Sequence, residues 1–192
     1  MFTPNLVVFS HLRWSFVHQR SRHLLGRLAG RWQITFIEEP AHSAAQAFIE
    51  VLEVEEHLTV LVPHTPLKAP GFHDEQLGVL YPMIDDWMSE HGIEQTILWL
   101  TTPMALPLAQ ALDPLCLVYD CRDEPDAFRT APPPLWERER ALMKQAALVV
   151  FEGPAMDESR RRLNPHVLCV PGPLEAPDCP ADRLDPVFDA CR

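Results

Sequence analysis

Glycine is scarce in this sequence, and long apolar runs are absent. The 7 glycines among 192 residues form no G-x-G-x-x-G, G-x-x-x-x-G-K-S/T or G-x-S-x-G motif, which disfavours a nicotinamide dehydrogenase, a P-loop NTPase and an α/β-hydrolase. Apolar runs such as 6–9 and 146–151 are far shorter than the ~20 residues of a membrane helix. Because no basic segment followed by an apolar stretch opens the chain, we expect neither a secretory signal nor a membrane span.

Acidic residues are absent before Glu38, although the whole chain carries a formal net charge of −11. That net charge argues against a nucleic-acid partner held by phosphate contacts. The basic residues of this first segment are Arg13, Arg20, Arg22, Arg27 and Arg31, with His11, His18 and His23. Such a segment either binds a small anion, such as a phosphate or a sugar nucleotide, or is a solvated helix face. Charge alone leaves both interpretations open.

The 5 cysteines form no C-x-x-C pair, and H-E-x-x-H does not occur. The sequence therefore predicts reduced thiols, with neither a zinc framework nor a disulfide scaffold. The acidic residues Asp120, Asp123 and Glu124 could suggest a carboxylate metal site. However, adjacent side chains point apart, and Asp123 is better placed to cap a following helix. We expect no metal and no cofactor.

Short apolar runs alternate with helical patterns, which is typical of a parallel sheet covered on both faces. The seven predicted strands are 6–9, 34–37, 58–62, 96–100, 116–119, 148–151 and 167–170, the third of them ending at Pro63. Helices are predicted around Leu24–Leu28, 77–87, 104–112, 135–145 and 154–163. The predicted fold is a doubly wound, mostly parallel, Rossmann-like α/β domain over residues 1–172. Residues 173–192 are predicted to be a proline-rich linker or tail.

Polar residues follow most of the predicted strands, where an open parallel sheet binds its ligands. These residues are Ser10, His11, Arg13, Trp14, Glu38, Glu39, Thr101, Thr102, Asp120, Arg122, Asp123, Glu124, Glu152 and Gly153. We expect His11, Glu39, Thr102 and Asp120 to share one rim of the sheet. The density of polar groups predicts a site but does not name its reaction.

Two rim residues have a functional and a structural interpretation. His11 is a candidate general base because imidazole titrates near neutral pH, although a loop histidine more often only packs or caps. Arg13, together with Arg20, could grip a phosphate or carboxylate in bidentate geometry, or could lie on the surface without a ligand. The residues alone leave these alternatives open.

Five motifs occur in order along residues 5–172. They are V-V-F-S-H-L-R-W-S-F-V-H-Q-R at 7–20, F-I-E-E-P at 36–40, T-T-P-M-A-L-P at 101–107, Y-D-C-R-D-E at 119–124 and L-V-V-F-E-G-P at 148–154. Together they resemble the first half of bacterial GT-B glycosyltransferases of the group-1-like, teichuronic-acid-biosynthesis type. Those sequences carry similar S-H-x-R-W-x-F-x-x-Q-R-P, Y-T-P-M-A-L-P and Y-D-C-M-D-E segments.

The resemblance implies a GT-B acceptor-side domain, which transfers a sugar from a nucleotide-sugar to a cell-surface glycan or a lipid-linked precursor. His11 and Asp120 would be catalytic in such a cleft. The implied substrate-binding residues are Arg13, Trp14, Arg20, Glu39, Thr102 and Glu124. Enzymes of this fold usually need no divalent metal. The implied location is the cytoplasm or the inner face of the membrane, and a homodimer through the exposed rim is a further expectation.

Three departures from the family pattern bear on activity more than on fold. Ser21 stands where the family has proline, Ser15 where an acidic residue is common, and Pro171–Glu175 where a polar bridge enters the donor domain. They leave open a non-catalytic binding or assembly module derived from a glycosyltransferase, or a small nucleotide-binding Rossmann domain. In each case we expect this chain alone to bind nucleotide-sugars poorly and to transfer nothing, because transfer needs donor and acceptor held between two walls.

Overall fold

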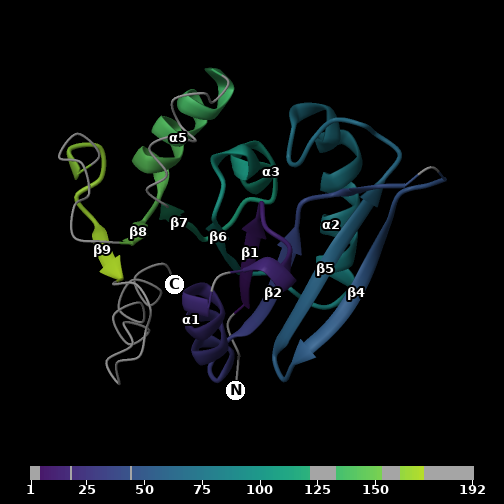
Figure 1. The fold of residues 1–192 in the computed structure, drawn as a ribbon, viewed down its shortest axis with the longest axis horizontal. Coiled ribbons are helices and arrows are strands. Elements are labelled where there is room, and N and C mark those ends of the chain that lie inside the picture. Colours follow the sequence, from purple (N-terminus) through teal and green to yellow (C-terminus); the bar gives the residue numbers. More distant parts are fainter. Residues whose placement is uncertain (1–4, 18, 44, 122–132, 153–160, 171–192) are drawn as a thin grey trace.

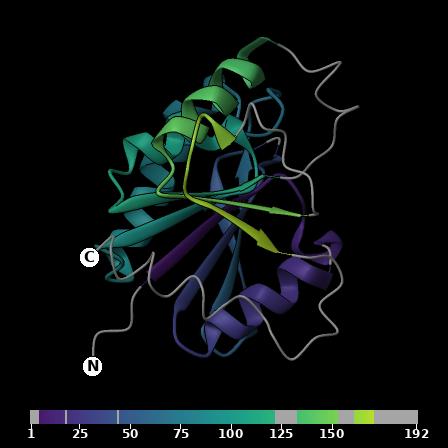
Figure 2. The ribbon, with the colours of Figure 1, turned by 90° about the vertical axis from the view of Figure 1, so that its left-hand side faces the viewer.

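The computed structural model describes residues 5–17, 19–43, 45–121, 133–152 and 161–170. Within them a nine-stranded sheet is covered by helices on both faces (Figures 1 and 2). The strands are β1 Asn5–Ser10, β2 Gln33–Glu38, β3 Ala41–His42, β4 Phe48–Glu55, β5 Leu58–Thr65, β6 Thr96–Leu100, β7 Cys116–Cys121, β8 Leu148–Glu152 and β9 Val167–Val170. The α-helices are α1 Gln19–Ala29, α2 Leu77–Glu90, α3 Leu106–Ala111 and α5 Pro133–Gln145, and short 3-10 turns are η1 Trp14–Phe16, η2 Asp74–Gln76 and η3 Pro103–Ala105.

The sheet is doubly wound around β1. Its strand order is β3-β5-β2-β1-β6-β7-β8-β9, and β4 pairs with β5. Every pair is parallel except β4 with β5. The chain moves from β1 to β2 and β5 on one side and then returns to β6 on the other. This reversal between β1 and β6 is the switch point at which doubly wound sheets bind ligands.

Helices on both faces divide the core into two layers, with β1 contributing to each. Val7 and Phe9 pack into the layer under α2, α3 and α5, whereas Leu6 and Val8 pack into the layer under α1. Among the α-helices of the described residues, Figure 2 shows α1 on one face of the sheet and α5 on the opposite face. Because side chains alternate along a strand, a strand covered on both faces must be apolar throughout, as β1 is.

Helix α1 closes its face of the sheet with three leucines. Leu24, Leu25 and Leu28 are all buried, at the 3.6-residue spacing of one helix face. The helix ends at Ala29, next to the predicted stop at Gly30, and Trp32 is buried just beyond it. The predicted helices around 77–87, 104–112 and 135–145 also form, as α2, η3 with α3, and α5.

The predicted doubly wound, mostly parallel fold is confirmed, and each predicted strand is present. Two further strands, β3 and β4, were not predicted. β4 lies at the sheet edge with both faces largely exposed, so its sequence mixes apolar and acidic residues without a single buried face. The predicted end at Pro63 is wrong. Proline removes only one donor, and β5 continues because β3 and β4 both pair with His64.

Three further expectations concern the cysteines, the last helix with the tail, and membrane-spanning helices. Cys121 and Cys169 form no disulfide, but Cys116 is disulfide-bonded, so the expectation of reduced thiols is wrong at Cys116. Most of the predicted helix 154–163 and the predicted tail 173–192 lie outside the described residues. None of the helices in the described ranges has the length and apolar character needed to cross a membrane.

The end of α5 depends on one buried amide. The Asn164 side chain donates to the carbonyls of Met143 at 2.9 Å and Ala146 at 2.7 Å, and its Oδ1 accepts from His166 N–H at 2.8 Å. Asn164→Ala should leave these groups without their partner and lower the free energy of unfolding by about 1–3 kcal/mol in urea titrations. The control is Gln110→Ala, which removes an exposed contact to Gln145 at the same helix end. Equal losses in both variants would contradict this role.

Candidate functional site

The ends of β1 and β6 are joined by side chains at the switch point. His11 Nδ1 lies 3.2 Å from Thr101 Oγ1. Thr101 N–H donates to the Phe9 carbonyl at 3.0 Å, and the buried Ser10 hydroxyl accepts from Leu12 N–H at 3.1 Å. The imidazole of His11 is therefore placed by the adjacent strand, where a ligand of a doubly wound sheet would bind.

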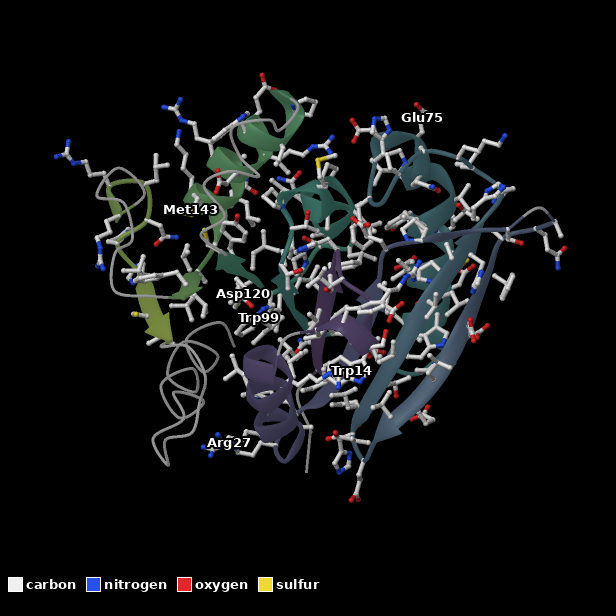
Figure 3. All side chains as sticks on the ribbon, viewed as in Figure 1. Trp14, Arg27, Glu75, Trp99, Asp120 and Met143 are labelled. Carbon is white, nitrogen blue, oxygen red and sulfur yellow. The ribbon has the colours of Figure 1, made fainter. Side chains whose placement is uncertain are left out.

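A small recess opens beside these residues, on the face that α1 covers. It is lined by Val8, Ser10, Val17, Leu24, Leu25, Phe36, Trp99, Thr101 and Asp120. The lining is apolar except for Ser10, Thr101 and Asp120, and Figure 3 shows Asp120 and Trp99 together above α1. The enclosed volume is about 10 Å³, which is roughly the space of one water molecule. The recess is thus too small to hold a sugar by itself.

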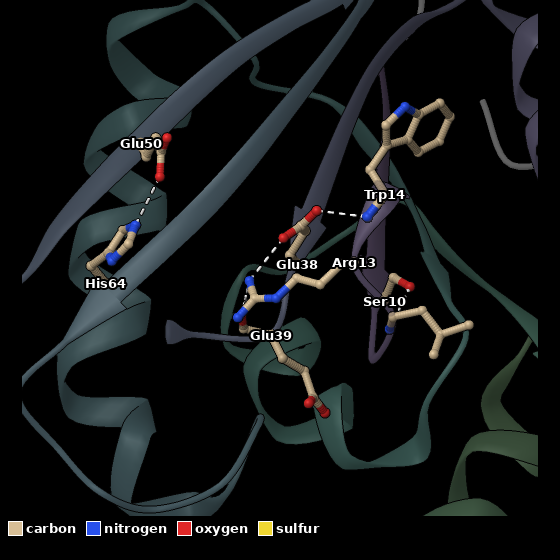
Figure 4. A network of polar contacts seen from close by, with 8 residues as sticks. Ser10, Arg13, Trp14, Glu38, Glu39, Glu50 and His64 are labelled. Carbon is tan, nitrogen blue, oxygen red and sulfur yellow. Dashed lines mark hydrogen bonds and ion pairs between the residues drawn. The ribbon is translucent and has the colours of Figure 1, made fainter. Parts of the chain in front are cut away.

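The loop after β1 is held by the carboxylate of Glu38. Arg13 donates to Glu38 Oε2 at 2.8 Å and to the Glu39 carbonyl at 2.9 Å, while Trp14 N–H donates to Glu38 Oε1 at 2.6 Å (Figure 4). Glu38 is buried, so its charge needs these partners. Arg13 therefore fastens the loop to the end of β2, and its predicted contact with substrate stays a prediction.

The ring of Trp14 lies among side chains of the same segment. Its centroid is 5.0 Å from that of Phe36 in an edge-to-face arrangement, and the Arg22 guanidinium lies 5.3 Å from its centre. Arg22 also donates to the Trp14 carbonyl from both Nε and Nη2. Substrate binding by Trp14 stays a prediction as well. Phe16, at the end of the same short turn, is largely exposed.

Glu39 lies at the end of β2 under the loop that follows β5. A Cβ on Gly71 would lie 2.4 Å from Glu39 Oε1, and Gly71 has φ +51°. Burial raises the pKa of the Glu39 carboxyl, and the positive charge of Arg13 opposes that shift only in part. The carboxyl makes no hydrogen bond to any residue that the structure describes. A half-buried carboxyl of this kind is a candidate for ligand contact.

The structure brings four predicted site residues to one rim. The strands β2, β1, β6 and β7 are parallel neighbours in the sheet. Glu39, His11 and Thr102 come just after the first three of them, and Asp120 is near the end of β7. Thr102 is buried, however, and its hydroxyl accepts from Met104 N–H at 3.3 Å to cap η3. Thr101 is the residue that contacts His11. Its position directly after β6 is the sequence feature that could have indicated this contact.

Other predicted residues lie away from the rim or outside what is described. Glu124 belongs to the undescribed range 122–132, and Arg20 lies in α1 with a side chain that the structure does not describe. Arg27 is at the C-terminal end of α1, on the far side from Asp120 in Figure 3, and Arg31 follows it. Across the described part of the chain, no three His, Cys, Asp or Glu side chains gather as a metal ion would require.

Comparisons with known proteins show the fold. No protein-family model and no curated protein matches the sequence. The chain is similar to a sucrose-phosphate synthase structure from Thermosynechococcus elongatus, with 12% identity, a TM-score of 0.60, and coverage of 97% of this chain and 98% of that one. A longer sucrose-phosphate synthase from the same organism matches at 12% identity and TM-score 0.60, and the likeness covers 88% of this chain and 48% of that chain.

A further likeness is to the Escherichia coli trehalose-6-phosphate protein bound with UDP-2-fluoro glucose. It has 15% identity, a TM-score of 0.46, and coverage of 83% of this chain and 41% of that one. The chain thus spans a little under half of these longer proteins. Its fold is the α/β Rossmann-like fold of GT-B glycosyltransferases. The teichuronic-acid type expected from the sequence stays a prediction.

The Glu38 contacts predict a large effect of one substitution on stability. Glu38→Ala should lower the free energy of unfolding by about 1–3 kcal/mol, because it removes the acceptor of the Trp14 N–H and one of the two acceptors of the partly exposed Arg13 guanidinium. The matched control is Glu50→Ala, which removes a carboxylate 3.0 Å from His64 in a more exposed pair (Figure 4). That change should cost at most about 1 kcal/mol. Chemical denaturation of both variants tests the contrast, and similar costs would refute it.

The raised pKa of Glu39 predicts a pH-dependent stability. The pKa of Glu39 is higher in the folded than in the unfolded protein. The carboxyl therefore lowers the free energy of unfolding as pH rises through the folded-state pKa, and it has no such effect at pH values below the unfolded-state pKa. Glu39→Gln removes this loss. We expect its Tm to exceed that of the parent at pH 7 and to equal it below about pH 4, the usual range of the Glu pKa. A lower Tm of the variant at pH 7 would contradict the assigned cause.

Proposed function

We propose that this chain is the acceptor-side half of a GT-B glycosyltransferase, which transfers a sugar from a nucleotide-sugar to a glycan or a lipid-linked acceptor. The observation that carries the proposal is the polar rim at the switch point, where His11 and Thr101 meet beside Asp120. The GT-B fold supports the class of reaction. A domain with only a structural role needs no titratable residues at that position.

The reaction requires a group that takes a proton. As the acceptor oxygen bonds to the anomeric carbon of the donor sugar, the acceptor hydroxyl loses its proton and the nucleoside diphosphate leaves. Imidazole can accept that proton near neutral pH, and His11 is held for this role by Thr101. Asp120, buried in the lining of the same recess, supplies a carboxylate that can orient a sugar hydroxyl.

The geometry supports a two-part site. The recess is small, and we infer that this domain supplies one wall while a second domain would hold the donor against it. The length of the longer sucrose-phosphate synthase, of which the likeness covers 48%, is in keeping with such a division. The donor class suggests a cytoplasmic protein, at the inner face of the membrane if the acceptor is lipid-linked. The expected homodimer remains a prediction.

The experiment measures turnover by the whole gene product that contains this chain. With a panel of UDP-, GDP- and dTDP-sugars we expect hydrolysis or transfer with at least one donor, and His11→Ala should lower kcat about 100-fold or more. His64→Ala, which changes a histidine of β5 away from the switch point, is the matched control and should leave kcat unchanged.

The 192-residue chain alone is the second arm of the same experiment. We expect no transfer and no micromolar binding of nucleotide-sugars in calorimetric titration. Micromolar binding would place the donor site within this chain and refute the division into two walls. Absence of turnover by the whole gene product with every donor would favour the non-catalytic module over the enzyme.

A further inference from the structure

We propose that Glu39 and Gly71 form the point at which this domain recognises an uncharged sugar, with a sugar hydroxyl donating to the Glu39 carboxyl. The inference rests on the proposed function and names the acceptor class for the same rim. The Glu39 carboxyl lies between the end of β1 and the loop after β5. No described residue forms a hydrogen bond with it.

The backbone of Glu39 is held from both sides. Its N–H donates to the Ser10 carbonyl at 3.1 Å, and its carbonyl accepts from Arg13 at 2.9 Å. These bonds attach the residue to the end of β1, beside His11. In Figure 4 the Glu39 carboxyl points away from the Arg13 guanidinium, and no dashed line reaches it. The side chain is therefore placed by its own backbone, and no described residue hydrogen-bonds to its carboxyl.

Gly71 lets the loop after β5 close on this carboxyl. Any side chain at position 71 would collide with Glu39, since a Cβ would lie 2.4 Å from Oε1 and 2.7 Å from Cδ. The φ of +51° also favours glycine there. The next residue, Phe72, is buried against Phe9 of β1 in an edge-to-face contact at 5.7 Å, which anchors the loop. The close approach is thus built into the fold.

The charges around Glu39 select a neutral ligand. Arg13 already bonds to the Glu38 carboxylate and to the Glu39 carbonyl. Burial outweighs the influence of Arg13 and raises the pKa of Glu39, so the ionised carboxyl is poorly solvated. A phosphate would bring a like charge to this place, whereas a sugar hydroxyl supplies the donor that a carboxylate needs. We therefore infer an uncharged sugar at this end of the rim.

The test is an NMR titration of the isotopically labelled 192-residue chain. The probes are D-glucose, D-galactose, N-acetyl-D-glucosamine and D-glucose 6-phosphate, and the signals followed are the Glu39 carboxyl carbon and the Gly71 amide. We expect at least one neutral sugar to shift both signals, and glucose 6-phosphate to bind no more tightly than glucose. Glu39→Ala should weaken that sugar's binding by about 10-fold or more, with Glu39→Gln intermediate, because a charge-assisted hydrogen bond is lost.

The control variant is Glu50→Gln, which changes a carboxylate of β4 and should leave binding unchanged. Gly71→Ala should weaken binding like Glu39→Ala, and its amide spectrum reports whether the fold is kept. The inference is overturned if no sugar shifts the two signals, if the variants bind as the parent does, or if the phosphate binds about 10-fold more tightly. Failure of this inference can be told apart from failure of the proposed function. If only the inference fails, the whole gene product still turns over, and Glu39→Ala leaves the KM for the acceptor unchanged.

Discussion

The parallel pairing of β1 with β2 on one edge and with β6 on the other is the constraint on which the rest of the structure depends. All six residues of β1 are buried, because helices also cover both faces. A slip by one residue would turn Ser10 to the opposite face and exchange the two core layers. The register therefore fixes which polar groups reach the rim, and His11 meets Thr101 as a result.

The charged residues of the loop after β1 mainly hold that loop together. Arg13 and Arg22 bond to Glu38 and to backbone carbonyls, and the buried Glu38 carboxylate receives both a guanidinium and an N–H. Glu39, one residue beyond the end of β2, lies against Gly71, and its carboxyl has no such partner among the described residues. Two adjacent glutamates thus have different environments.

The proposed function has this rim work against a second surface. The recess between α1 and the sheet is small, and its polar members lie at or just after the ends of three neighbouring strands, β1, β6 and β7. Such a surface can hold one reactant in a defined orientation. Excluding water from a transfer reaction requires a further wall. The likeness to sucrose-phosphate synthase at 12% identity establishes the fold, while the chemistry is inferred from the side chains at this rim.

The amino-acid sequence by itself determined the alternation of strands and helices, since buried strands such as β1 and β6 and the leucine face of α1 carry strong local periodicity. It also placed the polar residues after the strands. Only the tertiary structure decided that Arg13 would be engaged by Glu38, that Thr101 rather than Thr102 would contact His11, and that Gly71 would lie against Glu39. The physical reason is that these contacts join residues distant in sequence, and their partners depend on register and packing that local patterns do not encode.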